Sequence, residues 1–154
     1  MGAEEAVVSL GLSLPDAPPP VGAYVPFVQT GSLLFVSGQI PLRDGKLIHE
    51  GKVGREVDFE AARECARQCF LNALAQVRAA LGSLDRVSRV VRLSGYVASA
   101  EGFTDQAGVL NESSELAVQV FGEAGKHSRI AIGAAELPLG SPVEVDVILE
   151  VKES

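Results

Sequence analysis

The sequence predicts an α+β domain of two layers, in which a mixed β-sheet carries two helices on one face. Apolar residues recur at helical spacing over 59–81 and again over about 107–121, and β-rich runs come before, between and after these segments. The order is therefore two strands, helix, strand, helix, two strands. Because a strand, a helix and a further strand recur along the chain, both helices on one face of a mixed sheet is the simplest architecture.

Length and composition indicate a single domain spanning residues 1–154. Hydrophobic residues make up 47% of the chain and charged residues 21%, a composition that disordered proteins do not have. No apolar run approaches the roughly 20 residues that cross a bilayer, so we expect no membrane contact. The first residues are acidic and lack the basic start and cleavage signature of a secretory signal, which favours a cytoplasmic location.

The balance of charge argues against nucleic acid as a partner. The chain has 13 Lys and Arg residues against 20 Asp and Glu residues, for a formal net charge of −7. Proteins bind nucleic acids mainly by neutralising phosphates with Lys and Arg. The sequence therefore predicts no nucleic-acid partner.

The N-terminal part of the chain is expected to contain a tail and then a hairpin. Residues 1–20 are rich in Pro, Ser and Gly and are expected to drape over the domain without forming a unit of their own. Two β-rich runs follow, 23–30 and 33–40, and Gly31 lies at the turn between them. An Asp-Gly turn at 43–46 and a polar loop complete this region.

The clearest element is the helix over 59–81, for which Asp58 is the expected cap and Gly82 the end. A long strand over 84–98 and the second helix over about 107–121 come next. Gly122 and Gly125 end that helix.

The last two strands carry the residues of most chemical interest. Arg129 is a solitary cation in an apolar strand, and after a Pro-containing turn the strand 143–151 carries Glu144. We expect these two strands to pair, and the two charges then suggest a site for a small anion, because a guanidinium can hold a carboxylate through two hydrogen bonds. The alternatives are that Arg129 makes an ion pair at an edge or interface and that Glu144 only neutralises it there. Asp146 shares a strand face with Glu144 and is a candidate substitute or a solvated residue.

The strands contain more apolar side chains than one buried sheet face requires. The second face therefore needs a cover, and self-association with closed cyclic symmetry buries identical surfaces on every copy. The sequence predicts an obligate homo-oligomer.

Two cysteines and two histidines receive no catalytic or metal-binding role. Cys65 and Cys69 lie on one helix face without a second pair of ligands, so we interpret them as small buried residues and expect no metal site. His49 falls in a loop. His127 is close to Arg129, as a titrating neighbour or as a residue at the entry of the strand.

Two motifs give the chain a family resemblance from about Val21 to Val151. They are the run from Ser37 to Pro41, SGQIP, and the spacing from Arg129 through Leu137-Pro138 to Glu144. In this order they resemble the RidA/YjgF family of reactive-intermediate deaminases, also called L-PSP endoribonucleases. The resemblance implies a chorismate-mutase-like fold and a homotrimer with ligand clefts between subunits.

The resemblance also assigns roles to individual residues. Arg129 stands where the family binds the substrate carboxylate, and Glu144 where it has the acid associated with the attacking water. The implied substrate-binding residues are Tyr24, Ser37, Gly38, Asn111 and Ala131. The implied reaction is hydrolysis of a reactive 2-imino acid to a 2-keto acid and ammonia, which needs no cofactor.

The chain departs from the family pattern around Arg129. His127-Ser128 stands where the family has Pro-Ala, and Ile130-Ala131 follows where it has Ser and then Thr or Cys. The chain therefore resembles a divergent subgroup. Three functions stay open: an imine deaminase; a non-catalytic trimer that binds small carboxylates or partner proteins; and, with the net charge against it, an endoribonuclease.

Overall fold

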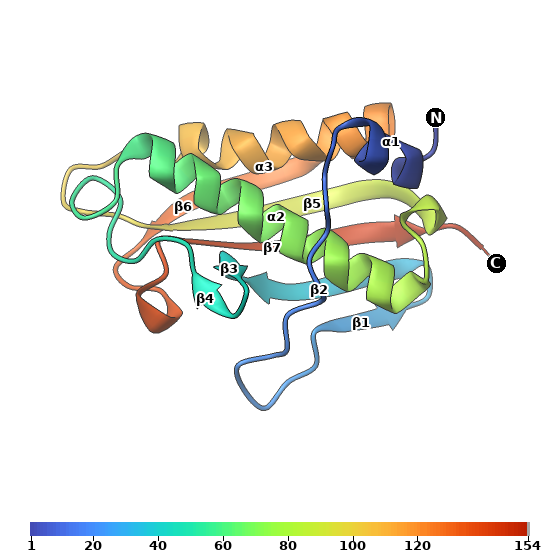
Figure 1. Cartoon of the computed structure of the whole chain (residues 1–154), viewed down its shortest axis with the longest axis horizontal. Helices are drawn as coiled ribbons and strands as arrows, with labels where there is room; N and C mark the ends of the chain where they lie inside the picture. The colour runs from blue at the N-terminus through green and yellow to red at the C-terminus, as the bar shows by residue number, and fades with distance from the viewer. Residues whose placement is uncertain (154) are drawn as a thin grey trace.

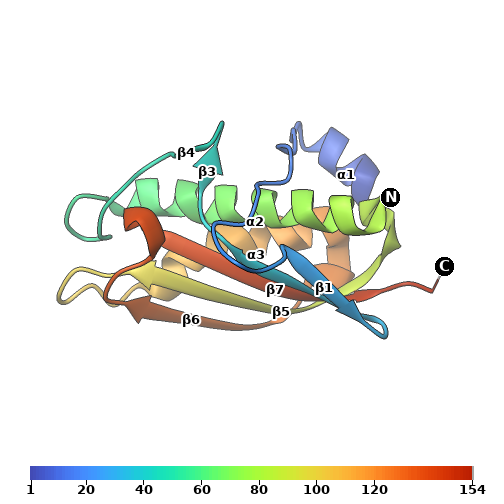
Figure 2. The same cartoon turned by 90° about the horizontal axis from the view of Figure 1, so that it is seen from below.

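The computed structural model describes residues 1–153 and has the two predicted layers (Figures 1 and 2). One layer is a five-stranded sheet in the order β1-β2-β7-β5-β6. The helices are α1 (Ala3–Ser9), α2 (Phe59–Leu81) and α3 (Gln106–Phe121). The strands of the sheet are β1 (Phe27–Thr30), β2 (Leu33–Gln39), β5 (Val87–Ala98), β6 (Ser128–Ala134) and β7 (Val143–Val151). A small hairpin pairs β3 (Leu42–Arg43) with β4 (Lys46–Leu47), and short 3-10 turns lie at Leu84–Arg86, Gly122–Gly125 and Pro138–Gly140.

The two long helices begin and end close to where the sequence predicts. The Asp58 carboxylate accepts a hydrogen bond from the Ala61 backbone N–H at 2.8 Å, and Gly82 ends α2 in the left-handed region with φ 83°. The Asp105 carboxylate caps α3 in the same way by accepting from the Gly108 N–H. Both helices lie on one face of the sheet, as predicted (Figure 2).

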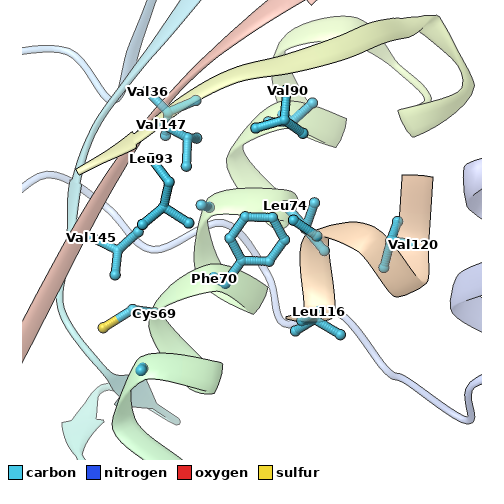
Figure 3. Close-up of a cluster of buried hydrophobic side chains, with 14 of the residues drawn as sticks. Val36, Cys69, Phe70, Leu74, Val90, Leu93, Leu116, Val120, Val145 and Val147 are labelled. Atoms are coloured by element: carbon cyan, nitrogen blue, oxygen red, sulfur yellow. The ribbon is translucent and has the colours of Figure 1, made fainter. Parts of the chain in front are cut away.

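The core lies between the helices and the sheet. Alternate residues of β7 are buried, from Val143 to Val151, while Glu144 and the other even-numbered residues face away from the helices. Figure 3 shows Phe70 and Leu74 of α2 packed with Leu116 of α3 against Leu93 and other side chains of the sheet. The sheet thus has a helix face, which is buried, and an open face.

The segment 1–20, expected to drape over the domain, begins with a helix, α1, that the sequence did not predict. Its residues Ala3, Ala6 and Val7 are buried. The Glu4 carboxylate accepts hydrogen bonds from Arg78 and from the Leu84 backbone N–H. The rest of this segment crosses α2 toward β1 (Figure 1).

Two predicted strands are shorter in the structure. Residues Leu84–Arg86 form a 3-10 turn, so the strand predicted from Leu84 begins at Val87. The first strand of the hairpin begins at Phe27, since the preceding proline has no N–H to donate to a ladder. Tyr24 therefore precedes the sheet.

The prediction that the last two strands pair is also wrong. β6 pairs in parallel with β5, and β7 pairs antiparallel with β2 and β5, so β5 lies between β6 and β7. Helix α3 supplies the crossover that the parallel pair of β5 and β6 requires, and the chain from β6 to β7 passes through the turn at Pro138–Gly140. The sheet is mixed, as predicted.

The open face leaves apolar side chains exposed. Val28 and Phe35 are 52% and 39% exposed near one edge, and Ile130 and Ile132 are 39% and 43% exposed on the other edge strand. Within residues 1–153 no helix is both long and apolar enough to span a membrane.

Candidate functional site

The structure places the predicted site residues in two groups, and Arg129 anchors the first. Arg129 lies on β6 opposite the buried Leu93 of β5, so its side chain is on the helix face. Its Nη1 atom donates to Asn111 Oδ1 at 2.9 Å and to Ser114 Oγ at 3.1 Å. Asn111 and Ser114 are three residues apart on α3, which runs beside β6 (Figure 1).

His127 completes this group through Ser114. The His127 Nε2 atom lies 2.9 Å from Ser114 Oγ, and its Nδ1 atom lies 2.6 Å from the Gly125 carbonyl oxygen. A carbonyl oxygen only accepts, so Nδ1 carries the proton that it donates to Gly125. In the neutral ring Nε2 then accepts from the Ser114 hydroxyl. Ser114 is thereby held between His127 and Arg129.

We call Arg129, Asn111, Ser114, His127 and Ala131 the Arg129 half-site. Ala131 follows Arg129 on the same side of β6 and packs partly against the core. The half-site therefore presents a half-buried guanidinium whose geometry is fixed by α3.

Glu144 belongs to the second group, on the open face of the sheet. Its carboxylate lies directly over Gly38, so close that a Cβ atom at residue 38 would overlap a carboxylate oxygen. Gly38 lies in the irregular stretch of β2 where the register with β7 shifts between Val36 and Gln39. The SGQ motif therefore creates the space that Glu144 occupies.

Ser37 and Tyr24 lie beside Gly38. The Ser37 hydroxyl donates to the Val25 carbonyl oxygen at 2.7 Å, which ties the segment before β1 to β2. Tyr24 accepts a hydrogen bond from the Val21 N–H at 3.2 Å, and with Gly38 it lines a small cavity of about 20 Å³. We call Glu144, Gly38, Ser37 and Tyr24 the Glu144 half-site.

Two further groups of the open face act on Glu144. Tyr96 is directly opposite Glu144 in the register of β5 and β7, and its hydroxyl donates to Asp146 Oδ2 at 3.2 Å. Burial, and secondly the negative charge of Asp146, raise the pKa of Glu144 above its ordinary 4.5. Burial also raises the pKa of Asp146, although Tyr96 and Ser94 oppose this by hydrogen bonding.

The two half-sites do not meet within one chain. Leu93, opposite Arg129, and Tyr96, opposite Glu144, are three residues apart on β5 and so point to opposite faces of the sheet. The direct pairing of Arg129 with Glu144 that the sequence suggested is absent from residues 1–153 of a single copy. Any site that uses both residues needs a second copy.

Sequence reasoning did not find Ser114, His127 or Tyr96 as members of the site. Ser114 follows Asn111 by three residues and so shares its helix face, a signal present in the sequence. Tyr96 could not be found in this way, because its position opposite Glu144 depends on which strands pair.

Comparison with known proteins relates the whole domain to one family. The family model described as "YjgF/chorismate mutase-like, putative endoribonuclease" matches residues 4–151. This chain belongs to the RidA/YjgF family. The resemblance carried by the SGQIP run and by the spacing from Arg129 to Glu144 is thereby confirmed.

Individual relatives cover nearly all of the chain. It is 44% identical over 143 residues to Protein TCP17 from Trypanosoma cruzi, covering 92% of this chain and 89% of that protein. It is 29% identical to the 2-iminobutanoate/2-iminopropanoate deaminase of Dermatophagoides farinae, covering 92% and 95%. The crystal structure of Atu1372 from Agrobacterium tumefaciens, a protein described as having unknown function, is similar with a TM-score of 0.91 and 45% identity, covering 97% and 92%.

Proposed function

We propose that this protein is a cofactor-free deaminase that hydrolyses 2-imino acids to 2-keto acids and ammonia, in a cleft completed by two copies of the chain. The main support for a shared cleft is that the cationic part and the acidic part of the site lie on opposite faces of the sheet. Membership of a family that includes a protein named as an imine deaminase supports this chemistry.

The Arg129 half-site suits the carboxylate of such a substrate. The guanidinium is held by Asn111 and Ser114 through Nη1 alone, which leaves its other N–H groups for a ligand. A planar carboxylate matches this fork of donors with two parallel hydrogen bonds. Because α3 fixes the guanidinium, little side-chain entropy is lost on binding.

The Glu144 half-site suits the water that attacks the C=N carbon. Water adds to the protonated imine to give a tetrahedral carbinolamine, and this intermediate then releases ammonia as the C=O bond forms. Glu144 accepts one proton of the attacking water and returns it to the departing nitrogen, and the remaining hydroxyl proton passes to the released ammonia, which leaves as ammonium. Its raised pKa brings it closer to neutrality, where one group can both accept and donate a proton.

A cyclic homotrimer joins the two half-sites. β6 is an edge strand of the sheet, and it presents Ile130 and Ile132 to the outside. Val28 and Phe35 are exposed on the open face near the opposite edge. Contact between these two different surfaces on successive copies is heterologous and closes into a ring, which covers both apolar patches.

The proposal is tested by timing keto-acid release from freshly generated 2-imino acids, with semicarbazide as the competing trap. We expect the wild-type protein to suppress semicarbazone formation. We expect Arg129→Ala and Glu144→Gln each to lower kcat/KM by about 100-fold or more, the order that positioning and proton transfer contribute. Circular dichroism and sedimentation show whether each variant keeps its fold and assembly.

The alternatives give different results in the same experiments. A non-catalytic trimer would bind 2-keto acids beside Arg129 without accelerating hydrolysis of any imino acid. An endoribonuclease would cleave RNA in a way that survives purification and is lost in the Arg129 and Glu144 variants. Either outcome contradicts the deaminase.

A further inference from the structure

A groove of about 620 Å³ opens beside Arg129, on the side of α3 that faces the chain leading into β6. Its lining consists of Ser114, Glu115, Val118, Gln119, Lys126, His127 and Arg129. Since Arg129 and Ser114 belong both to the groove and to the Arg129 half-site, a ligand whose carboxylate is bound by Arg129 has this groove beside it.

The groove offers a ligand mainly apolar contact. Most of its surface is apolar, and Val118 of α3 is 38% exposed there. Two of its polar groups are already engaged within the protein. Lys126 Nζ makes an ion pair with Glu123 at 2.8 Å, and both ring nitrogens of His127 have partners.

The size of the groove exceeds the needs of a small substrate. Pockets of about 300–1,000 Å³ hold molecules of drug size, whereas the imino acid of alanine has a single methyl group beyond its reacting centre. Each CH₂ group buried in an apolar groove is removed from water, which lowers the free energy of binding. A substrate with a long or aromatic side chain would gain this energy, and a small one would not.

We propose that this groove binds the side chain of a bulky apolar 2-imino acid, so that the preferred substrates derive from amino acids of the leucine and phenylalanine type. This inference rests on the proposed function and names its substrate class. Val118 is then the residue that contacts the substrate side chain, with Ser114 at the junction between side chain and carboxylate.

The test compares imino acids generated by D-amino-acid oxidase from D-alanine, D-leucine and D-phenylalanine. We expect kcat/KM to be about tenfold or more higher for the two bulky compounds, within the range that extra methylenes in an apolar pocket supply. Val118→Trp fills the groove, and we expect it to remove this preference while the alanine-derived compound is hydrolysed within about twofold of the wild-type rate. Val8→Trp, at a residue of α1 that is 77% exposed and outside the groove, is the matched control and should change neither rate.

Binding of the product analogues phenylpyruvate and pyruvate, followed by calorimetry, separates the two proposals. If all imino acids are hydrolysed with equal kcat/KM and Val118→Trp does not change these values, the groove inference is wrong but the proposed deaminase activity is supported. If nothing is hydrolysed but phenylpyruvate binds more tightly than pyruvate and loses this advantage in Val118→Trp, the deaminase is wrong and the groove stands as a binding site. Equal binding of both keto acids without hydrolysis contradicts both.

Discussion

Gly38 is the residue whose role depends most directly on having no side chain. The Glu144 carboxylate occupies the position where a Cβ atom would be, so any larger residue must push the acid aside. The neighbour that must move is the end of a flexible side chain, and the cost to the fold is therefore small. The cost to a reaction that depends on the position of Glu144 is larger.

We predict that Gly38→Ala lowers kcat by about 10- to 100-fold, the loss expected for a displacement of about 1 Å. The free energy of unfolding should change by less than about 1 kcal/mol, as measured by urea denaturation. In a Glu144→Gln background the same substitution should cause little further loss, because both changes act on one group. Fully additive losses would show that Gly38 acts independently of Glu144.

The ionisation of Glu144 predicts how kcat/KM depends on pH. As a base the group must be ionised, so kcat/KM should rise with pH through a midpoint above 4.5. Asp146→Asn removes a negative charge that raises the pKa of Glu144 and should shift this midpoint to lower pH. A pH profile of kcat/KM for both proteins measures the shift, and a midpoint that moves upward would contradict the assigned cause.

The same pKa shift predicts how stability depends on pH. The native state holds the Glu144 proton to a higher pH than the unfolded state, so it binds more protons between the two pKa values. The free energy of unfolding contributed by this group therefore falls as pH rises through that window. Glu144→Gln should weaken this dependence.

The sequence predicts some features of individual site residues but not others. Arg129, Glu144 and Gly38 could be proposed as site residues because motif and spacing are properties of the chain itself. The sheet faces on which Arg129 and Glu144 lie could not be predicted, because they depend on which strands pair. The expected pairing of β6 with β7 failed for this reason.

At the scale of elements, buried amides join α2 to the chain around the SGQIP run. Asn72 Nδ2 donates to the carbonyl oxygens of Ile40 and Leu42, both at 3.0 Å, and its Oδ1 accepts from Gln68. Gln76 Nε2 donates to the Pro18 carbonyl oxygen at 2.6 Å and so holds the segment that leads to Tyr24. α2 thus positions two parts of the Glu144 half-site.

We predict that Asn72→Ala lowers the free energy of unfolding by about 2–3 kcal/mol, because it removes the two hydrogen bonds to Ile40 and Leu42 and leaves the buried Gln68 amide without its acceptor. It should also lower kcat, since the turn that follows Gly38 loses its support. Chemical denaturation and imino-acid assays measure the two effects. A loss of stability below about 0.5 kcal/mol would mean that water replaces the amide.

The elements that could be predicted are those with local signals. Asp58, Gly82 and the apolar spacing between them define α2 from sequence neighbours alone. α1 was missed because a helix of seven residues is too short to be stable by itself, and it depends on packing and on the contacts of Glu4 with distant residues. Strand order is likewise a long-range property.

At the scale of the whole molecule, the exposed apolar residues of the open face predict an assembly. We expect Ile132→Asp to reduce the sedimenting mass from that of three chains to that of one, because it places a charge in the proposed contact. Deaminase activity should be lost with the assembly. Val8→Asp, at an exposed residue of α1, is the control and should leave the mass unchanged.

A site formed by Arg129 of one copy and Glu144 of another can be tested by mixing two inactive variants. Arg129→Ala and Glu144→Gln chains are denatured together, refolded as mixed assemblies and assayed against the separately refolded parents. If each site takes one residue from each copy, about a quarter of the sites in an equal mixture pair an intact Arg129 with an intact Glu144, and about that fraction of wild-type activity returns. Mixed assemblies as inactive as their parents would contradict a site shared between copies.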